Sequence, residues 1–158
     1  MNIKTIFCDM DGVLVDFRKG CEDLDAIEGT KVDWTKVHKI GPNFWADLDW
    51  TKDGQEFVKW LISFCKECSI DLCILSAVNY KDGVKGKQIW LDEKIPSISK
   101  QNRYFVRFGK DKYKYASKNA LLIDDYGKNV EGFIMAGGHG VKFKNFQQAK
   151  EEIITLVK

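Results

Sequence analysis

The sequence predicts an α/β fold of three layers, in which helices cover both faces of a Rossmann-like parallel sheet. Three short apolar runs, at residues 3–8, 71–75 and 120–123, each end abruptly in acidic or hydroxyl-bearing side chains, as buried strands do where they meet loops. The segments between these runs carry apolar residues at the i, i+3, i+4 spacing of helices. Strands that alternate with helices favour a parallel sheet that is covered on both faces.

The remaining elements follow in order along the chain. Weaker strand candidates lie at 104–106 and 141–143, and helices are expected where the helical spacing recurs, at residues 57–68, 89–91, 130–135 and 149–157. Residues 16–50 are acidic and aromatic, lack a convincing strand and are interrupted by Gly41-Pro42. We therefore expect one domain over residues 1–158, with a core of residues 1–15 and 51–158 and a small helical cap of residues 16–50 inserted after the first strand.

The composition is that of an ordinary globular protein. A chain of 158 residues with 44% hydrophobic content is long enough to bury a core. Asp9 and Asp11 interrupt the amino-terminal apolar run, and the stretch at 60–65 is far shorter than the roughly 20 residues that span a bilayer. We expect a soluble, cytoplasmic protein without a membrane partner. Cys65 and Cys68 have C-x-x-C spacing but lie on a helical apolar stripe, which favours core packing over a metal site.

Charge is distributed unevenly. Residues 1–56 hold twelve Asp and Glu against seven Lys and Arg, whereas residues 81–118 hold eleven Lys and Arg against four Asp and Glu. A basic segment that faces an acidic one suits a site for a metal and a phosphate, although a solvated lysine-rich surface accounts for most of these lysines. We expect no stable nucleic-acid partner, because aromatic residues are not regularly interleaved with these lysines.

Polar residues follow each of the three main strands. Asp9 and Asp11 follow the first, Ser76 follows the second, and Asp124 and Asp125 follow the third. Ligands of parallel α/β sheets bind outside the carboxyl ends of the strands, so these side chains are expected to converge on one crevice. A helix amino-terminal cap is the alternative interpretation of the last acidic pair.

These residue types suit the hydrolysis of a phosphate monoester, which needs a nucleophile, a proton source for the leaving oxygen and cations that offset the phosphoryl charge. Asp9 and Asp11 reach one phosphate only if the backbone curls between them, and Gly12 permits that curl. Because two carboxylates repel a phosphate dianion, we expect Mg²⁺, which binds oxygen ligands, at Asp9 and Asp124. The hydroxyl group of Ser76 and a lysine of the basic segment are expected to bind phosphate oxygens.

The order of these motifs along the whole chain resembles the haloacid dehalogenase superfamily of aspartyl-phosphate phosphatases. The motifs are the run 9–14, Ser76 after an apolar strand, a basic residue before the last motif, and Asp124-Asp125. The resemblance implies that Asp9 attacks phosphorus and that Asp11 serves as the acid and base. It also implies that Asp9, the carbonyl group of Asp11 and Asp124 hold the metal, and that Asp125 orients the water around it.

One branch of that superfamily, the 5'(3')-deoxyribonucleotidases, is similar in further details. Among the four candidates Lys110, Lys112, Lys114 and Lys118, the spacing of Lys114 to Asp124 is similar to that branch, and Lys114 is therefore selected as the phosphate-binding lysine. The branch is also similar in Asp16-Phe17, in Phe44-Trp45, in Lys87 three residues before Trp90, and in the segment 137–141.

That similarity implies a substrate site. Phe17, Phe44 and Trp45 would form an aromatic wall around a nucleobase, and Lys87 would be a second phosphate ligand. Stacking of a base on an aromatic ring contributes about 1 to 3 kcal/mol. The alternative is that these aromatic residues form the core of the small cap, together with Trp50.

The resemblance therefore implies a magnesium-dependent 5'(3')-deoxyribonucleotidase, which converts deoxyribonucleoside monophosphates to nucleoside and phosphate through an aspartyl-phosphate. Three departures from the family pattern are a short cap, Ala77 after Ser76, and Tyr126 after Asp125. The first two bear on the choice of substrate. The alternatives are a phosphatase of other small phosphate esters or of polynucleotide 3' ends, and a non-catalytic nucleotide-binding relative. A homodimer is left open.

Overall fold

The computed structural model describes residues 2–78 and 80–158. At its centre is a parallel sheet of five strands in the order β5-β4-β1-β6-β7. The predicted α/β architecture is confirmed, and the two weaker strand candidates form the two edges of the sheet. The strands are β1 (Thr5–Cys8), β4 (Asp71–Ala77), β5 (Arg103–Val106), β6 (Ala120–Asp124) and β7 (His139–Lys142).

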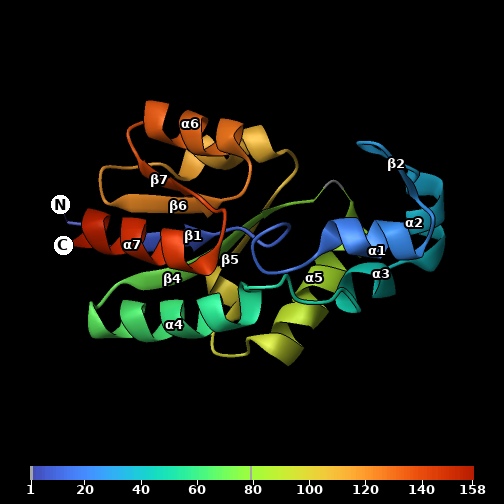
Figure 1. The fold of residues 1–158 in the computed structure, drawn as a ribbon, viewed down its shortest axis with the longest axis horizontal. Helices are drawn as coiled ribbons and strands as arrows, with labels where there is room; N and C mark the ends of the chain where they lie inside the picture. The colour runs from blue at the N-terminus through green and yellow to red at the C-terminus, as the bar shows by residue number, and fades with distance from the viewer. Residues whose placement is uncertain (1, 79) are drawn as a thin grey trace.

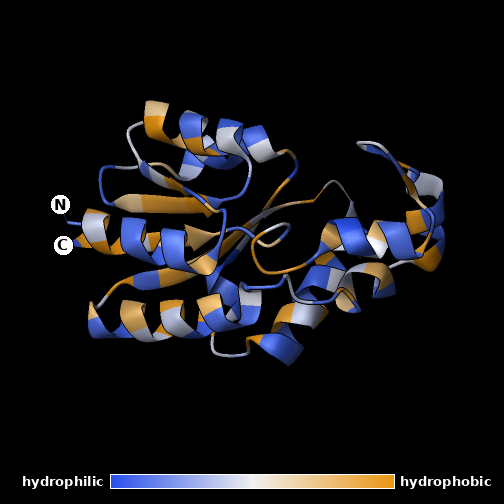
Figure 2. Cartoon of the chain, viewed as in Figure 1, coloured by the Kyte–Doolittle hydropathy of each residue, from blue (hydrophilic) through white to orange (hydrophobic). Residues whose placement is uncertain are grey.

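Side chains of the central strands alternate between two apolar layers, as the period of two in a strand requires. In β1, Ile6 and Cys8 belong to the larger core cluster, whereas Phe7 belongs to the smaller one. Helices α4 (Gly54–Glu67) and α7 (Phe146–Val157) contribute to the larger cluster, and α6 (Gly127–Met135) contributes to the smaller one on the other face (Figure 1). The buried residues of α4 recur at helical spacing, as Phe57, Leu61 and Phe64 do, and Figure 2 shows hydrophobic and hydrophilic residues alternating along the helices.

The cap, residues 16–50, leaves the core after β1 and returns before α4. It contains α1 (Phe17–Asp23), α2 (Trp34–Ile40) and α3 (Asn43–Ala46), and it lies at the opposite end of the molecule from the two termini (Figure 1). It also contains a hairpin, β2 (Ile27–Glu28) and β3 (Lys31–Val32), that the sequence did not predict. Two-residue strands are too short for an alternating pattern, and the chain reverses at Gly29, where φ is +62°.

The cap is attached to the core through adjacent backbone segments and through α5 (Lys81–Lys94). The amide of Asp16 donates to the carbonyl of Asp49 at 2.9 Å, so the outgoing and returning chains are paired. Helix α3 lies directly on α5. The two helices are so close that a Cβ atom at Gly86 of α5 would collide with the carbonyl oxygen of Pro42, which precedes α3. The indole N–H of Trp90, further along α5, donates to the carbonyl of Leu48 at 2.9 Å.

The structure also bears on membrane-spanning helices and on the five cysteines. None of the helices in the described part of the chain combines the length and the apolarity needed to cross a bilayer. All five cysteines are free thiols, with Cys65 buried and Cys68 exposed. The thiol of Cys65 therefore packs as a small apolar group.

Candidate active site

The chain curls immediately after β1. The carbonyl group of Met10 accepts backbone hydrogen bonds from Leu14 at 2.8 Å and from Val15 at 3.0 Å, which closes a single tight turn. Gly12 lies in this turn with φ at +81°, and a Cβ atom there would collide with the carboxyl group of Asp125. Glycine is therefore favoured at this position by its backbone conformation, and the missing Cβ atom lets the carboxyl group of Asp125 lie against the turn.

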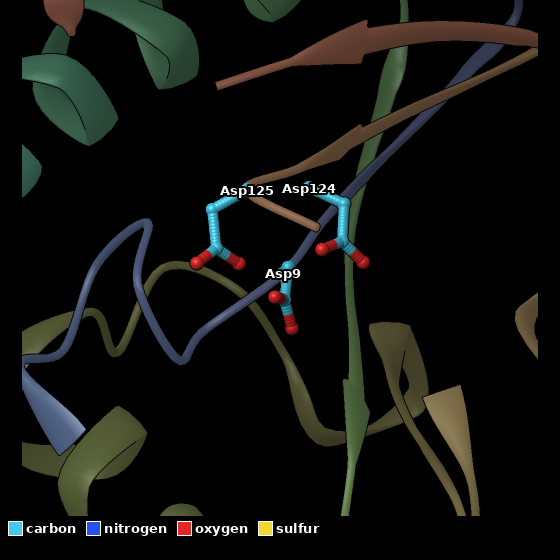
Figure 3. A group of neighbouring side chains, drawn as sticks. All are labelled: Asp9, Asp124 and Asp125. Carbon is cyan, nitrogen blue, oxygen red and sulfur yellow. The ribbon is translucent and has the colours of Figure 1, made fainter. Parts of the chain in front are cut away.

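Three carboxyl groups meet at the ends of β1 and β6. One oxygen atom from each of Asp9, Asp124 and Asp125 lies within 4.8 Å of the others. Figure 3 shows all three groups turned to the same side of the sheet edge. Asp9 and Asp124 are buried, whereas Asp125 is exposed. The structure thus brings together the acidic residues that the sequence predicted to converge.

The electrostatics of this cluster favour a bound cation. Burial raises the pKa of the Asp9 carboxyl; Lys112 opposes this rise, while the negative charges of Asp124 and Asp11 add to it. Partial burial of its carboxyl group, followed by the charge of Asp124, raises the pKa of Asp125 to about 6, although the residue as a whole is exposed. A hard divalent cation with oxygen ligands would offset this repulsion, so the donor set fits Mg²⁺.

Lys112 is the lysine that reaches the carboxylates. Its Nζ atom lies 2.8 Å from Oδ1 of Asp9 and 2.7 Å from Oδ2 of Asp124. Burial disfavours the charged form of Lys112, but Asp9 and Asp124 outweigh burial and raise its pKa. The ammonium group therefore stays protonated between them.

The structure does not bring Lys114, the lysine selected from the sequence, to these carboxylates. The side chain of Lys114 is 60% exposed, and its nearest acidic partner is Asp111 at 3.7 Å. Both lysines lie in the 3₁₀ helix η2 (Gly109–Tyr115), where residues three apart share a side. Lys112 lies on the same side of η2 as Tyr115, and the ring of Tyr115 packs on Phe7 of β1 with ring centroids 5.6 Å apart. Lys114 lies on a different side of η2, away from β1.

Lys87 and Ser76 lie together next to Asp11. The Nζ atom of Lys87 donates to Oδ2 of Asp11 at 2.8 Å, to Oγ of Ser76 at 2.7 Å and to the carbonyl of Ala77 at 3.1 Å. Lys87 and Ser76 are both buried. Since the Ser76 hydroxyl accepts this bond, its own hydrogen remains available for donation.

Asp124 has two kinds of partner. Its Oδ1 atom accepts the backbone N–H of Tyr126 at 2.9 Å, which forms a local turn before α6. Its Oδ2 atom accepts from Lys112 and also from the Asn129 amide at 3.1 Å. The alternative interpretation as a helix cap was wrong, because the N-cap of α6 is Tyr126 and no side chain caps that helix. Asn129 was missed from the sequence, because a single amide in the first turn of a helix carries no distinguishing pattern.

A cleft of about 330 Å³ opens above these residues. On the core side it is bordered by the acidic cluster, Asp11, Lys112 and Asn129, and on the cap side by Asp16, Phe17 and Arg18. The cleft therefore joins the carboxylates to the first residues of the cap.

The three predicted aromatic residues are not equivalent. Phe17 borders the cleft, and its ring meets that of Phe44 edge-on at 5.8 Å. Phe44 and Trp45 are only 6% and 3% exposed, and Trp45 packs on Tyr80, at the start of α5, at 5.2 Å. The structure thus brings Phe17 to the cleft and buries Phe44 and Trp45, with Trp45 between the cap and α5.

The sheet order, the helical cap after β1 and the acidic strand ends define a haloacid dehalogenase superfamily hydrolase fold. An uncharacterized protein from Corynebacterium glutamicum is 18% identical with a TM-score of 0.56, over 99% of this chain and 96% of that one. A hydrolase from Streptococcus pneumoniae is 13% identical with a TM-score of 0.58, over 98% and 100%. A haloacid dehalogenase family enzyme from Bacteroides thetaiotaomicron, solved with magnesium and inorganic phosphate, is 15% identical with a TM-score of 0.55, over 99% and 100%.

The family itself follows from a sequence match. Residues 22–150 match the family described as "5' nucleotidase, deoxy (Pyrimidine), cytosolic type C protein", and the chain belongs to this family. The matched range contains Ser76, Lys87, Lys112 and Asp124. A comparison with curated proteins finds no match.

Proposed function

We propose that the protein is a magnesium-dependent phosphate-monoester hydrolase that acts on deoxyribonucleoside monophosphates. The observation that carries the proposal is the cluster of Asp9, Asp124 and Asp125, within 4.8 Å of one another, with Lys112 in contact with Asp9 and Asp124. The family description supports a nucleotide substrate. The magnesium and phosphate bound by the Bacteroides thetaiotaomicron enzyme support the same cation and reaction.

The metal would be held by the carboxylates of Asp9 and Asp124 and by the carbonyl group of Asp11, with Asp125 orienting its water. When bound, Mg²⁺ supplies positive charge that lets a phosphate dianion approach two carboxylates. Lys112 supplies a further positive charge beside Asp9. Ser76 has a hydroxyl hydrogen available for a phosphate oxygen.

The reaction takes place in two displacements. In the first, a carboxylate oxygen of Asp9 forms a bond to phosphorus while the bond from phosphorus to the ester oxygen breaks, and Asp11 donates a proton to that oxygen. The nucleoside then leaves. In the second, water attacks the aspartyl-phosphate and Asp11 takes the proton of the water, which regenerates Asp9 and releases inorganic phosphate.

The base of the nucleotide would stack on Phe17, the aromatic residue that borders the cleft. Phe44 and Trp45 support Phe17 from inside the cap, so their contribution to the substrate site is indirect. The family description contains the word cytosolic, which supports the cytoplasm as the place of action.

The proposal is tested by phosphate release from a panel of esters. The panel contains 5' and 3' deoxyribonucleotides, the matching ribonucleotides, phosphosugars and a 3'-phosphorylated oligonucleotide, each with Mg²⁺ and with EDTA. We expect turnover of deoxyribonucleotides that needs Mg²⁺ and is lost in Asp9→Asn. Equal turnover by Asp9→Asn would refute the mechanism, and equal turnover of phosphosugars would favour a phosphatase of small esters.

A further inference from the structure

Lys87 connects three parts of the molecule through one buried ammonium group. It lies on α5, and its three acceptors are Asp11 in the turn after β1, and Ser76 and Ala77 at the end of β4. The residue is 1% exposed. An ammonium group has three N–H donors, so these acceptors account for all of them.

Lys112 provides an instructive contrast. Among residues 2–78 and 80–158 its ammonium group has two carboxylate acceptors, Asp9 and Asp124, which leaves one of its three donors for a ligand. Lys112 also borders the cleft, whereas Lys87 is not among the described residues that border it and donates to the carbonyl of Ala77, which does. The two buried lysines thus have different capacities to bind a phosphate oxygen.

The orientation of the Asp11 carboxyl group depends on its hydrogen bond from Lys87. Within the described residues, Oδ2 of Asp11 accepts from Lys87, and Oδ1 of Asp11 is buried without a hydrogen-bond partner. The side chain is 32% exposed and borders the cleft. Lys87 is therefore the hydrogen-bond donor that sets the orientation of this carboxyl group.

Lys87 is itself held in place by its neighbours on α5. Gly86 lies against the backbone of Pro42 in the cap, and Trp90 donates to the carbonyl of Leu48. These contacts lie on either side of Lys87 along the helix, so they fix both the depth and the register of α5 beneath Asp11. An ammonium group in such a position has little freedom to move toward the cleft.

We propose that Lys87 is a positioning residue for the proton transfer by Asp11 and not a ligand of the phosphate. This inference rests on the proposed phosphatase function. Lys87 holds the Asp11 carboxyl group toward the leaving oxygen. In the first displacement the proton passes from Asp11 to the ester oxygen as its bond to phosphorus breaks, and Lys87 keeps its proton throughout.

The test compares Lys87→Met with Lys112→Met on two substrates. A nucleoside monophosphate has a poor leaving group that needs protonation, whereas p-nitrophenyl phosphate releases a stable anion that needs little. In Lys87→Met we expect kcat/KM for the nucleotide to fall by about 100-fold, as for the loss of general acid catalysis, and kcat/KM for p-nitrophenyl phosphate to fall by less than about 10-fold. The ratio of the two values is independent of the fraction of folded protein.

A second measurement does not depend on turnover. Binding of inorganic phosphate in the presence of Mg²⁺, followed by calorimetry, should be retained in Lys87→Met and weakened in Lys112→Met. Weakened phosphate binding in Lys87→Met, or equal losses of kcat/KM on both substrates, would overturn the positioning role. If the wild-type protein binds phosphate but hydrolyses neither ester, the phosphatase proposal fails instead, and the binding comparison still decides whether Lys87 is a phosphate ligand.

Discussion

The carboxylate of Asp9 and the ammonium group of Lys112 lie 2.8 Å apart, with side chains only 8% and 2% exposed. This pair joins the end of β1 to η2, and a second contact from Lys112 at 2.7 Å adds Asp124 at the end of β6. A charge that is removed from water in this way stabilises the fold only while its partners are present. The same contact therefore bears on both stability and the proposed chemistry.

The first prediction separates Lys112 from Lys114. Lys112→Met leaves the buried carboxylates of Asp9 and Asp124 without their cation, so we expect a loss of about 3 to 5 kcal/mol in the free energy of unfolding without metal. Lys114→Met removes only an exposed pair with Asp111, for which about 0 to 1 kcal/mol is expected. Urea denaturation of both variants in EDTA measures the difference. Equal losses would show that the burial of Lys112 has no energetic consequence.

The lysines also show where prediction from the sequence ended. Apolar runs that stop at acidic residues identified β1, β4 and β6 and hence the convergence of Asp9, Ser76 and Asp124. The choice among lysines needed the phase of a 3₁₀ helix, since three residues per turn direct Lys112 inward and Lys114 outward. Spacing along the chain carries no information on that phase.

The aromatic residues of the cap show a second limit. A large aromatic side chain produces the same sequence pattern whether it packs in a core or binds a base. Phe44 and Trp45 became buried because α3 approaches α5 closely at Gly86, a contact between segments about 40 residues apart along the chain. Phe17 lies earlier in the chain, outside the contact between α3 and α5, and its side chain borders the cleft.

The second prediction distinguishes a substrate contact from a core residue. Phe17→Ala removes the ring that borders the cleft, and we expect KM for deoxyribonucleotides to rise about 5- to 150-fold, the equivalent of 1 to 3 kcal/mol of stacking. Phe44→Ala should instead lower the free energy of unfolding by about 3 to 5 kcal/mol. Steady-state kinetics and denaturation of both variants are needed. An unchanged KM in Phe17→Ala would remove this residue from the substrate site.

The third prediction concerns the metal. Mg²⁺ that binds the folded protein through Asp9 and Asp124 should raise the melting temperature, with a rise that increases with the logarithm of the Mg²⁺ concentration above the dissociation constant. Asp124→Asn should abolish this rise, whereas Asp23→Asn, which alters an exposed acidic residue paired with Lys19, should retain it. Thermal unfolding with and without Mg²⁺ provides the measurement. A full rise in Asp124→Asn would place the metal elsewhere.

The fourth prediction concerns pH in the absence of metal. The pKa of Asp125 is raised in the folded protein from 3.8 to about 6, so the folded state binds more protons than the unfolded state between these values. The contribution of Asp125 to stability is therefore largest below pH 4 and is lost as the pH rises through about 6. In EDTA, wild-type stability should fall more steeply than that of Asp125→Asn over this interval. Parallel curves for the two proteins would contradict the raised pKa.

The fifth prediction tests the contact that fixes α5. A methyl group at Gly86 would meet the backbone of Pro42 and the Cβ atom of Trp45, and neither can move without displacing α3. We expect Gly86→Ala to lower the free energy of unfolding by about 1 to 3 kcal/mol, the usual range for overpacking, and to reduce kcat because Lys87 moves with the helix.

Gly132→Ala on α6 is the matched control, since nothing lies within 4 Å of its new methyl group. That substitution should stabilise the protein by about 0.5 to 1 kcal/mol, because alanine is the better helix former, and should leave kcat unchanged. Stabilisation by both substitutions would mean that the cap does not hold α5, and that the orientation of Asp11 depends on the core alone.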